Sequence, residues 1–155
     1  MQSLKHIMVG LGWDVNAFDS GADFDLDASA FMCGANGKCP TEKEFVFYGN
    51  LEHPSGAVKH QGDNLTGEGD GDDEQIFVDL KAIPESVDKI AFTVTIYEAL
   101  GEKTKLWTSF QCVYPNCSMR IPIRSLIRYD LGEDFSIETA IVVGELYRHN
   151  GEWKF

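Results

Sequence analysis

The sequence predicts a mainly β protein, built as a sandwich of antiparallel strands. Short runs of alternating polar and apolar residues recur along the chain, and Gly, Asn, Asp and Pro separate them. This pattern is typical of strands joined by turns. Hydrophobic residues make up 43% of the 155 residues and include ten Phe, so one domain spanning residues 1–155 can bury a core. Many short strands at regular spacing favour a sandwich.

Each predicted element has a local reason. Residues 89–97 (KIAFTVTIY) are rich in β-branched and aromatic residues and give the clearest strand. Gly-Ala-Asn-Gly-Lys at 34–38 and Asn-Gly at 150–151 are predicted turns, and residues 80–84 (LKAIP) are predicted to form one helical turn. In chain order, the predicted strands are residues 6–13, 24–32, 44–48, 75–80, 89–97, 139–147 and 152–155.

An acidic run indicates a cation site. Residues 63–74 (DNLTGEGDGDDE) hold six carboxylates in twelve positions, with no Lys or Arg among them. The interleaved glycines allow the backbone to turn sharply and direct several oxygens to one point. Ca²⁺ takes about six to eight oxygen ligands in a tolerant geometry. The alternative for such a run on its own is a solvated acidic loop.

A second acidic segment favours the cation site. Residues 23–29 (DFDLDAS) alternate, so that in a strand Asp23, Asp25, Asp27 and Ser29 share one face. Carboxylates this close on one face are costly unless a cation or basic groups neutralise them. Neither acidic segment has the ligand spacing of an EF-hand. We therefore expect a two-part metal site without an EF-hand, provided that the fold brings the two segments together.

Composition limits the classes of partner. The net charge of −12 argues against nucleic acid and anionic membranes, and favours cations or basic surfaces. The sequence lacks a stretch apolar enough for membrane insertion, and the first residues do not resemble a signal peptide, so a cytoplasmic location is expected.

The sequence offers little catalytic chemistry. The four cysteines have spacings unlike those of a zinc site, the four histidines are scattered, and neither a nucleophile elbow nor a phosphate-binding glycine loop is present. We predict no enzymatic activity. The alternative is a thiol-dependent enzyme or detoxifier, and Cys33 and Cys39 are the thiols that it would use.

The motifs of this chain resemble those of the TerD family. The resemblance covers most of the chain, in the segments 9–14 (VGLGWD), 23–29, 62–74, 129–131, 135–140 and 144–155. It implies a β-sandwich of two antiparallel sheets with one or two short helices. It also implies a cytoplasmic, calcium-binding bacterial protein of tellurite resistance and the general stress response, which works as a Ca²⁺-dependent interaction module. Other tellurium-resistance proteins, in a membrane-proximal complex, are the expected partners.

Both acidic segments contribute to the predicted Ca²⁺ site. The strongest predicted ligands are Asp25, Asp27, Asp63, Asn64, Asp72, Asp73 and Glu74, with backbone carbonyls from Gly67 and Gly69. Asp23 and Asp70 are weaker members, because loop carboxylates can point to water without penalty. No catalytic or other cofactor-binding residue is predicted.

The chain also departs from the family pattern. Members of the family begin earlier and continue past Phe155, so we expect both ends to be incomplete. Residues 103–126 differ in kind from the family sequence. With permitted codons, residues 103–117 read one base later give Lys-Gln-Asn-Phe-Gly-Gln-Val-Ser-Asn-Ala-Tyr-Ile-Arg-Ile, and residues 118–126 read two bases later give Asn-Glu-Asp-Thr-Asp-Gln-Glu-Leu. Both are what the family has there.

A frameshift is the hypothesis that accounts for this stretch. Single-base insertions near Lys103, Cys117 and Leu126 produce both shifts and restore the frame. We therefore predict no function for Cys112 or Cys117. We also expect the altered stretch, with its two prolines, to fold less well than an intact relative, because proline removes a donor from a strand ladder.

Overall fold

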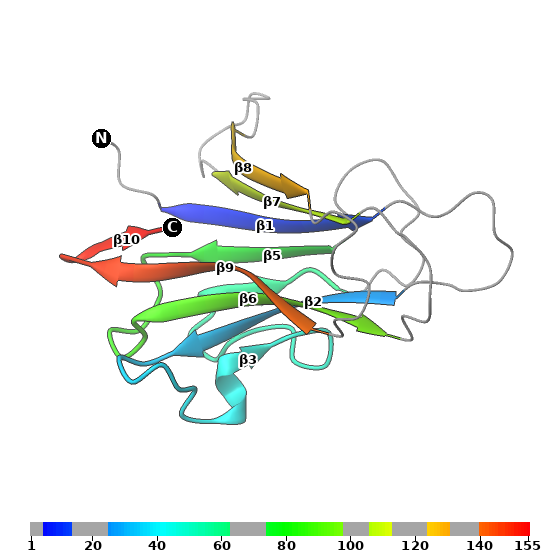
Figure 1. Cartoon of the computed structure of the whole chain (residues 1–155). Coiled ribbons are helices and arrows are strands. Elements are labelled where there is room, and N and C mark those ends of the chain that lie inside the picture. Colours follow the sequence, from blue (N-terminus) through cyan, green and yellow to red (C-terminus); the bar gives the residue numbers. More distant parts are fainter. Residues whose placement is uncertain (1–4, 14–24, 63–73, 98–105, 113–123, 131–139) are drawn as a thin grey trace, which may run out of the picture.

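The computed structural model describes residues 5–13, 25–62, 74–97, 106–112, 124–130 and 140–155. In these residues the chain forms two five-stranded sheets that pack face to face (Figure 1). The strand order is β4-β5-β1-β7-β8 in the first sheet and β10-β9-β6-β2-β3 in the second. Every strand pair is antiparallel. The predicted mainly β sandwich is confirmed.

The ten strands of the described residues divide equally between the two sheets. The first sheet contains β1 (His6–Trp13), β4 (Val58–His60), β5 (Glu74–Asp79), β7 (Leu106–Cys112) and β8 (Arg124–Asp130). The second sheet contains β2 (Asp25–Cys33), β3 (Phe45–Val46), β6 (Lys89–Tyr97), β9 (Ala140–His149) and β10 (Glu152–Lys154). Among the described residues, the helical element is a short 3₁₀ turn, η1 (Glu42–Glu44).

The core lies between the two sheets and is made by alternate residues of their strands. In β5, Ile76 and Val78 are buried, and in β2 the buried residues of the same kind are Ala30 and Met32. Phe92 of β6 is the largest fully buried side chain among the described residues. Burying one such side chain contributes roughly 1.5–3 kcal/mol, so this layer supplies the main driving force for folding.

The predictions were wrong at a few elements. Residues 80–84 form a turn instead of a helical turn, because the Asp79 carboxylate accepts the Lys81 N–H at 3.0 Å and the Asp79 carbonyl accepts the Ala82 N–H at 3.1 Å. The strand expected at 44–48 shortens to β3, since Phe47 and Asn50 pair with each other in a tight turn. Strand β4 was not predicted, because three residues are too few to show a period.

The stretch interpreted as frameshifted also contains strands. Strand β7 pairs with β1 from Ile7 opposite Cys112 to Trp13 opposite Leu106, and β8 pairs with β7. Sequence reasoning did not predict these ladders. A lower stability of this stretch stays a prediction, and its two prolines lie outside the described residues.

Arg148 ties β9 to the connection between β5 and β6. Its Nε donates to the Val87 carbonyl at 2.8 Å, and its Nη2 donates to the carbonyls of Ile83 and Pro84 at 3.2 and 3.1 Å. The guanidinium lies 4.6 Å from the centre of the Trp153 ring on β10. This planar group therefore satisfies three carbonyls of one turn and stacks on the final hairpin.

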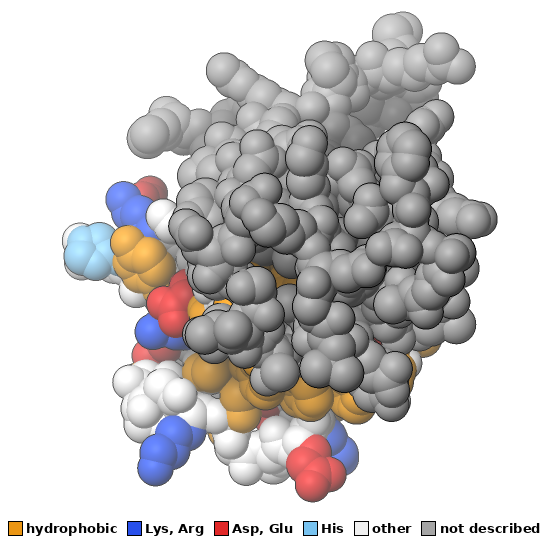
Figure 2. Space-filling view, turned by 45° about the vertical axis from the view of Figure 1, so that its right-hand side comes forward, with side chains coloured by type: hydrophobic (Ala, Val, Ile, Leu, Met, Phe, Trp, Pro, Cys, Tyr) orange, Lys and Arg blue, Asp and Glu red, His pale blue; other side chains and the backbone are white. Residues whose placement is uncertain are grey.

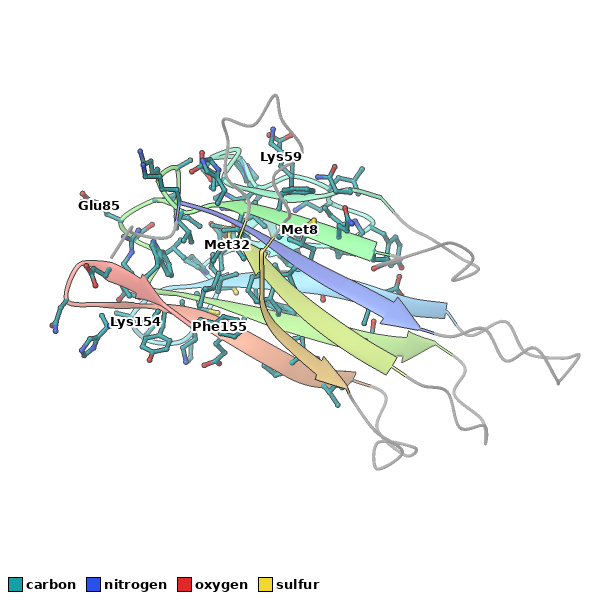
Figure 3. The ribbon with its side chains drawn as sticks, turned by 90° about the horizontal axis from the view of Figure 1, so that it is seen from above. Met8, Met32, Lys59, Glu85, Lys154 and Phe155 are labelled. Atoms are coloured by element: carbon teal, nitrogen blue, oxygen red, sulfur yellow. The ribbon has the colours of Figure 1, made fainter. Side chains whose placement is uncertain are left out.

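Replacing Arg148 by Lys tests this contact. Arg148→Lys keeps the charge but loses the forked geometry, so we expect the free energy of unfolding to fall by about 1–3 kcal/mol. Urea denaturation measures the change. Lys154→Ala, which removes an exposed cation from the same hairpin (Figure 3), is the matched control and should change stability by less than about 0.5 kcal/mol. Equal effects of the two substitutions would contradict the role of the guanidinium.

Candidate metal centre

The acidic loop, residues 63–73, connects the two strands of the β4–β5 hairpin. His60 of β4 lies opposite Ile76 of β5, and the Gln61 N–H donates to the Gln75 carbonyl at 2.9 Å. Gly62 then turns with a φ of +114°, which a residue with a side chain rarely adopts, and its N–H donates to His60 Nδ1 at 3.0 Å. The two ends of the acidic loop are thus held together by a stem formed by residues 60–62, 74 and 75.

Glu74 anchors this stem to the opposite sheet. Its side chain is fully buried, and its Oε2 accepts the backbone N–H of Ala28 at 2.6 Å. His60 Nε2 lies 3.5 Å from the same oxygen, and the imidazole is also fully buried. The buried carboxylate therefore joins β5 in one sheet to β2 in the other.

The topology explains why β2 needs this acceptor. Strand β3 is two residues long and pairs with β2 only at Ala30 and Phe31, so Ala28 lies beyond the end of β3. A buried backbone N–H without an acceptor costs free energy. The Glu74 carboxylate supplies the acceptor that a longer β3 would otherwise have provided.

The second acidic segment enters the sandwich at the same place. Alternation in β2 places Ala28 and Ala30 in the core and leaves Asp27 half-buried. Ser29, on the same face as Asp27, has its hydroxyl 2.6 Å from that of Thr93 on β6. The predicted division of β2 into a polar and an apolar face is confirmed for these residues.

The structure therefore brings the ends of the two acidic segments together. Glu74, which follows the acidic loop, holds the backbone of Ala28, which follows Asp27. Strands β2 and β5 both begin at the right-hand end of the sandwich in Figure 1. The side chains of Glu74 and Asp27 point in different directions. Glu74 points between the sheets, whereas Asp27 lies on the opposite face of β2 from Ala28.

Most of the predicted ligand set lies outside the described residues. Asp25 is the first residue of β2, and Asp27 and Glu74 are placed as above. The predicted ligands outside the described residues are Asp23, Asp63, Asn64, Gly67, Gly69, Asp70, Asp72 and Asp73. Within the part of the chain that is described, no three His, Cys, Asp or Glu side chains are grouped so that they could hold a metal. The complete ligand set stays a prediction.

Sequence reasoning missed the role of His60. The histidines looked scattered because the pairing of β4 with β5 was not predicted, and that pairing is what brings His60 to Glu74. The stem residue Glu74 was in turn interpreted only as a metal ligand, although its carboxylate also joins the sheets. The available signal was that Glu74 has the same phase as Ile76 and Val78 in an alternating strand.

His53 serves the local fold of a turn. Its side chain is buried, and its Nδ1 accepts the Ser55 N–H at 3.1 Å and lies 2.6 Å from the Ser55 hydroxyl. Burial lowers the pKa of His53, although the Glu44 carboxylate opposes that shift. A neutral imidazole, whose Nδ1 can accept a hydrogen bond, accounts for these contacts.

The thiols of Cys33 and Cys39 form a close pair. Their sulfurs lie 3.5 Å apart at the far end of β2 from the stem. Burial and the neighbouring Cys33 raise the pKa of Cys39 to about 12. The thiolate form, which is the reactive nucleophile, is therefore scarce at neutral pH.

The exposed side chains of the described surface are mixed in sign. On the face shown in Figure 2, acidic and basic groups lie beside one another and next to hydrophobic side chains. Examples are the pairs Lys59–Glu52 and Lys89–Glu145, at 3.5 and 3.3 Å. Among the described residues, no helix is long and apolar enough to cross a bilayer.

With this geometry in place, comparison with known protein families matches the TerD domain over residues 1–155. The chain belongs to the TerD family. Its relatives in this family include proteins named for tellurium resistance and for general stress.

Two relatives and one solved structure define the similarity. General stress protein 16U of Bacillus subtilis (strain 168) is 52% identical over 156 residues, which cover 98% of this chain and 78% of that protein. Tellurium resistance protein TerD of Serratia marcescens is 50% identical over 153 residues, with 99% and 79% covered. The crystal structure of a homologue of telluride resistance protein (TerD) from Streptomyces coelicolor A3(2) has a TM-score of 0.71 at 22% identity, covers 97% of this chain and 86% of that chain, and shows the shared fold.

A double-mutant cycle tests the stem of this TerD-family protein. Because His60 Nε2 and Glu74 Oε2 are 3.5 Å apart and fully buried, His60→Ala and Glu74→Gln should not have additive effects. We expect each to lower the free energy of unfolding by about 2–4 kcal/mol, with a coupling of about 1–3 kcal/mol between them. Urea denaturation in the presence of a chelator measures the cycle without a contribution from bound metal. Additivity within about 0.5 kcal/mol would contradict the interaction.

Proposed function

We propose that this TerD-family protein binds Ca²⁺ between its two acidic segments. The observation that carries the proposal is the bond from Glu74 to the Ala28 backbone, which holds the end of the acidic loop against the end of the second segment. Six carboxylates without a basic residue among residues 63–74 repel one another in the absence of a cation. Ca²⁺ suits such a site because it accepts many oxygen ligands in flexible geometry.

The proposed ligands are the residues predicted from the sequence. Asp63, Asn64, Asp72 and Asp73 supply side-chain oxygens, and Gly67 and Gly69 supply carbonyls. Asp25 and Asp27 complete the site from β2, with Asp23 and Asp70 as weaker members. Glu74 is also among the proposed ligands. In addition it anchors the stem, because its Oε2 accepts the backbone N–H of Ala28.

We further propose that the protein works in the cytoplasm as a Ca²⁺-dependent interaction module without enzymatic activity. A cation that neutralises the acidic segments changes the charge and order of one end of the sandwich, and a partner can recognise that change. The net charge of −12 favours a partner with a basic surface. Other tellurium-resistance proteins, in a membrane-proximal complex, are the partners that the family resemblance implies.

The alternative is direct action on tellurite through thiols, and it has weaker support. Cys33 and Cys39 are close enough to act together, at 3.5 Å. A reactive pair needs a thiolate, however, and burial raises the pKa of Cys39 to about 12. These thiols therefore fit a slow structural or redox role better than nucleophilic detoxification.

We propose that residues 103–126 arose through the frameshifts described above. Resequencing the locus tests this directly. We expect single-base insertions near the codons for Lys103, Cys117 and Leu126. An uninterrupted reading frame with unrelated codons would reject the frameshift. That result would not bear on the proposed metal site.

Titration calorimetry with Ca²⁺, and in parallel with Mg²⁺, tests the calcium site. Asp63→Ala combined with Asp73→Ala should abolish saturable Ca²⁺ binding, because two proposed ligands are lost from one loop. Saturating Ca²⁺ at about 100-fold above Kd should also stabilise the unchanged protein by about 2.7 kcal/mol, measured by thermal unfolding against a chelator.

The matched control removes the same charge elsewhere. Glu85→Ala with Glu152→Ala deletes two exposed carboxylates, and Glu85 lies at the opposite end of the sandwich from the start of β2 and β5 (Figure 3). This control should keep the Ca²⁺ affinity within about twofold. Undiminished binding by the loop variant would reject the assignment, and an equal loss in both variants would show that net charge alone matters.

A further inference from the structure

The thiol pair lies in a loop that already holds its two sulfurs together. Cys33 is the last residue of β2 and is buried, whereas Cys39 is half-buried. Their sulfurs are 3.5 Å apart, and a disulfide bond is about 2.05 Å long. A movement of roughly 1.5 Å would bring the sulfurs to bonding distance.

We propose that Cys33 and Cys39 form a reversible intramolecular disulfide, which makes this end of the sandwich a site of redox modification. The inference is independent of the proposed calcium site. Strand β2 begins beside the stem of the acidic loop and ends at Cys33, so the two sites lie at opposite ends of one strand (Figure 1).

The backbone around the pair favours closure. The Gly34 N–H donates to the Lys38 carbonyl at 3.0 Å and the Gly37 N–H donates to the Gly34 carbonyl at 2.9 Å, so the loop is a compact turn. Gly37 has a φ of +72°, which a glycine adopts without strain. The Cys33 carbonyl accepts the Asp88 N–H at 2.9 Å and fixes that side, so Cys39 is the residue that moves.

The oxidant that fits this site is a low-molecular-weight disulfide. The Cys39 thiol, which is the more exposed, loses its proton and attacks one sulfur of the small disulfide, releasing one small thiolate. Cys33 then loses its proton and attacks the Cys39 sulfur of the mixed disulfide, releasing the second small thiolate. Two protein thiols are oxidised to one disulfide, the small disulfide is reduced to two small thiols, and the two protons end on those thiols.

The surroundings set the speed and the durability of the reaction. Because burial raises the pKa of Cys39, little thiolate is present at neutral pH and the exchange is slower than for a solvent-exposed thiol. Pairs that are easily reduced are those whose thiolate is stabilised. This pair lacks that stabilisation, so its disulfide should persist once it has formed.

Peptide mapping after redox equilibration tests the proposal on the full chain. The protein is equilibrated in mixtures of reduced and oxidised glutathione, quenched with acid, unfolded, alkylated with iodoacetamide and digested with trypsin. Cleavage after Lys38 places Cys33 and Cys39 on separate peptides, so a disulfide between them appears as a linked pair. We expect that pair in the oxidised mixtures, with its loss on reduction by dithiothreitol, and an increase in Tm of roughly 5 °C in the oxidised form.

Two variants remove the competing explanations. Cys112→Ser with Cys117→Ser should keep the linked peptide, and Cys39→Ser should lose it while Cys33 becomes fully alkylated after unfolding. Cys33 and Cys39 both alkylated as free thiols in the most oxidising mixture would overturn the proposal. Separate glutathione adducts on each cysteine, or a link from either one to Cys112 or Cys117, would overturn it as well.

Discussion

The sandwich depends on a carboxylate that crosses between its sheets. Strand β2 is covered on one side by β6 along nine residues, but on the other side β3 pairs with only two of them. The exposed edge would leave the Ala28 N–H without an acceptor in the interior. Glu74 reaches from β5 to supply one, and the buried His60 lies beside its charge. This polar contact lies inside the core, where the Ala28 N–H donates to Glu74 Oε2 and His60 Nε2 lies 3.5 Å from the same oxygen.

The same contact holds the residue that follows the acidic loop. Because Glu74 follows the loop directly, the hydrogen bond from the Ala28 N–H to Glu74 also fixes one end of the loop against β2. The other end is held by Gly62, whose N–H donates to the His60 ring. Structural closure and the proposed cation site therefore share Glu74.

The opposite end of the sandwich is held by different chemistry. The Arg148 side chain donates to carbonyls of the β5–β6 connection and stacks on the Trp153 ring. The backbone N–H of Arg148 donates to the Asp88 carbonyl at 2.8 Å. The Asp88 N–H in turn donates to the carbonyl of Cys33, which is one member of the thiol pair. Hydrogen bonds thus link β9, the β5–β6 connection and the end of β2. The thiol pair lies at this end, so a disulfide there would add a covalent link to a region that these backbone hydrogen bonds already connect.

The sequence by itself determined the fold class, because alternation is a local property of a strand. The boundaries predicted for residues 6–13 and 89–97 agree with β1 and β6, and the Asn150-Gly151 turn appears with positive φ at both residues. The acidic composition of residues 63–74 likewise required no structure to be noticed. Strand β4 and the turn at Asp79 were not predicted. The conformation of β4 depends on its partner strand, and that of the turn depends on one side-chain hydrogen bond. Only the tertiary structure decided that Glu74 faces inward to His60 and that Cys33 meets Cys39, since strand pairing and loop closure bring together residues that no sequence period relates.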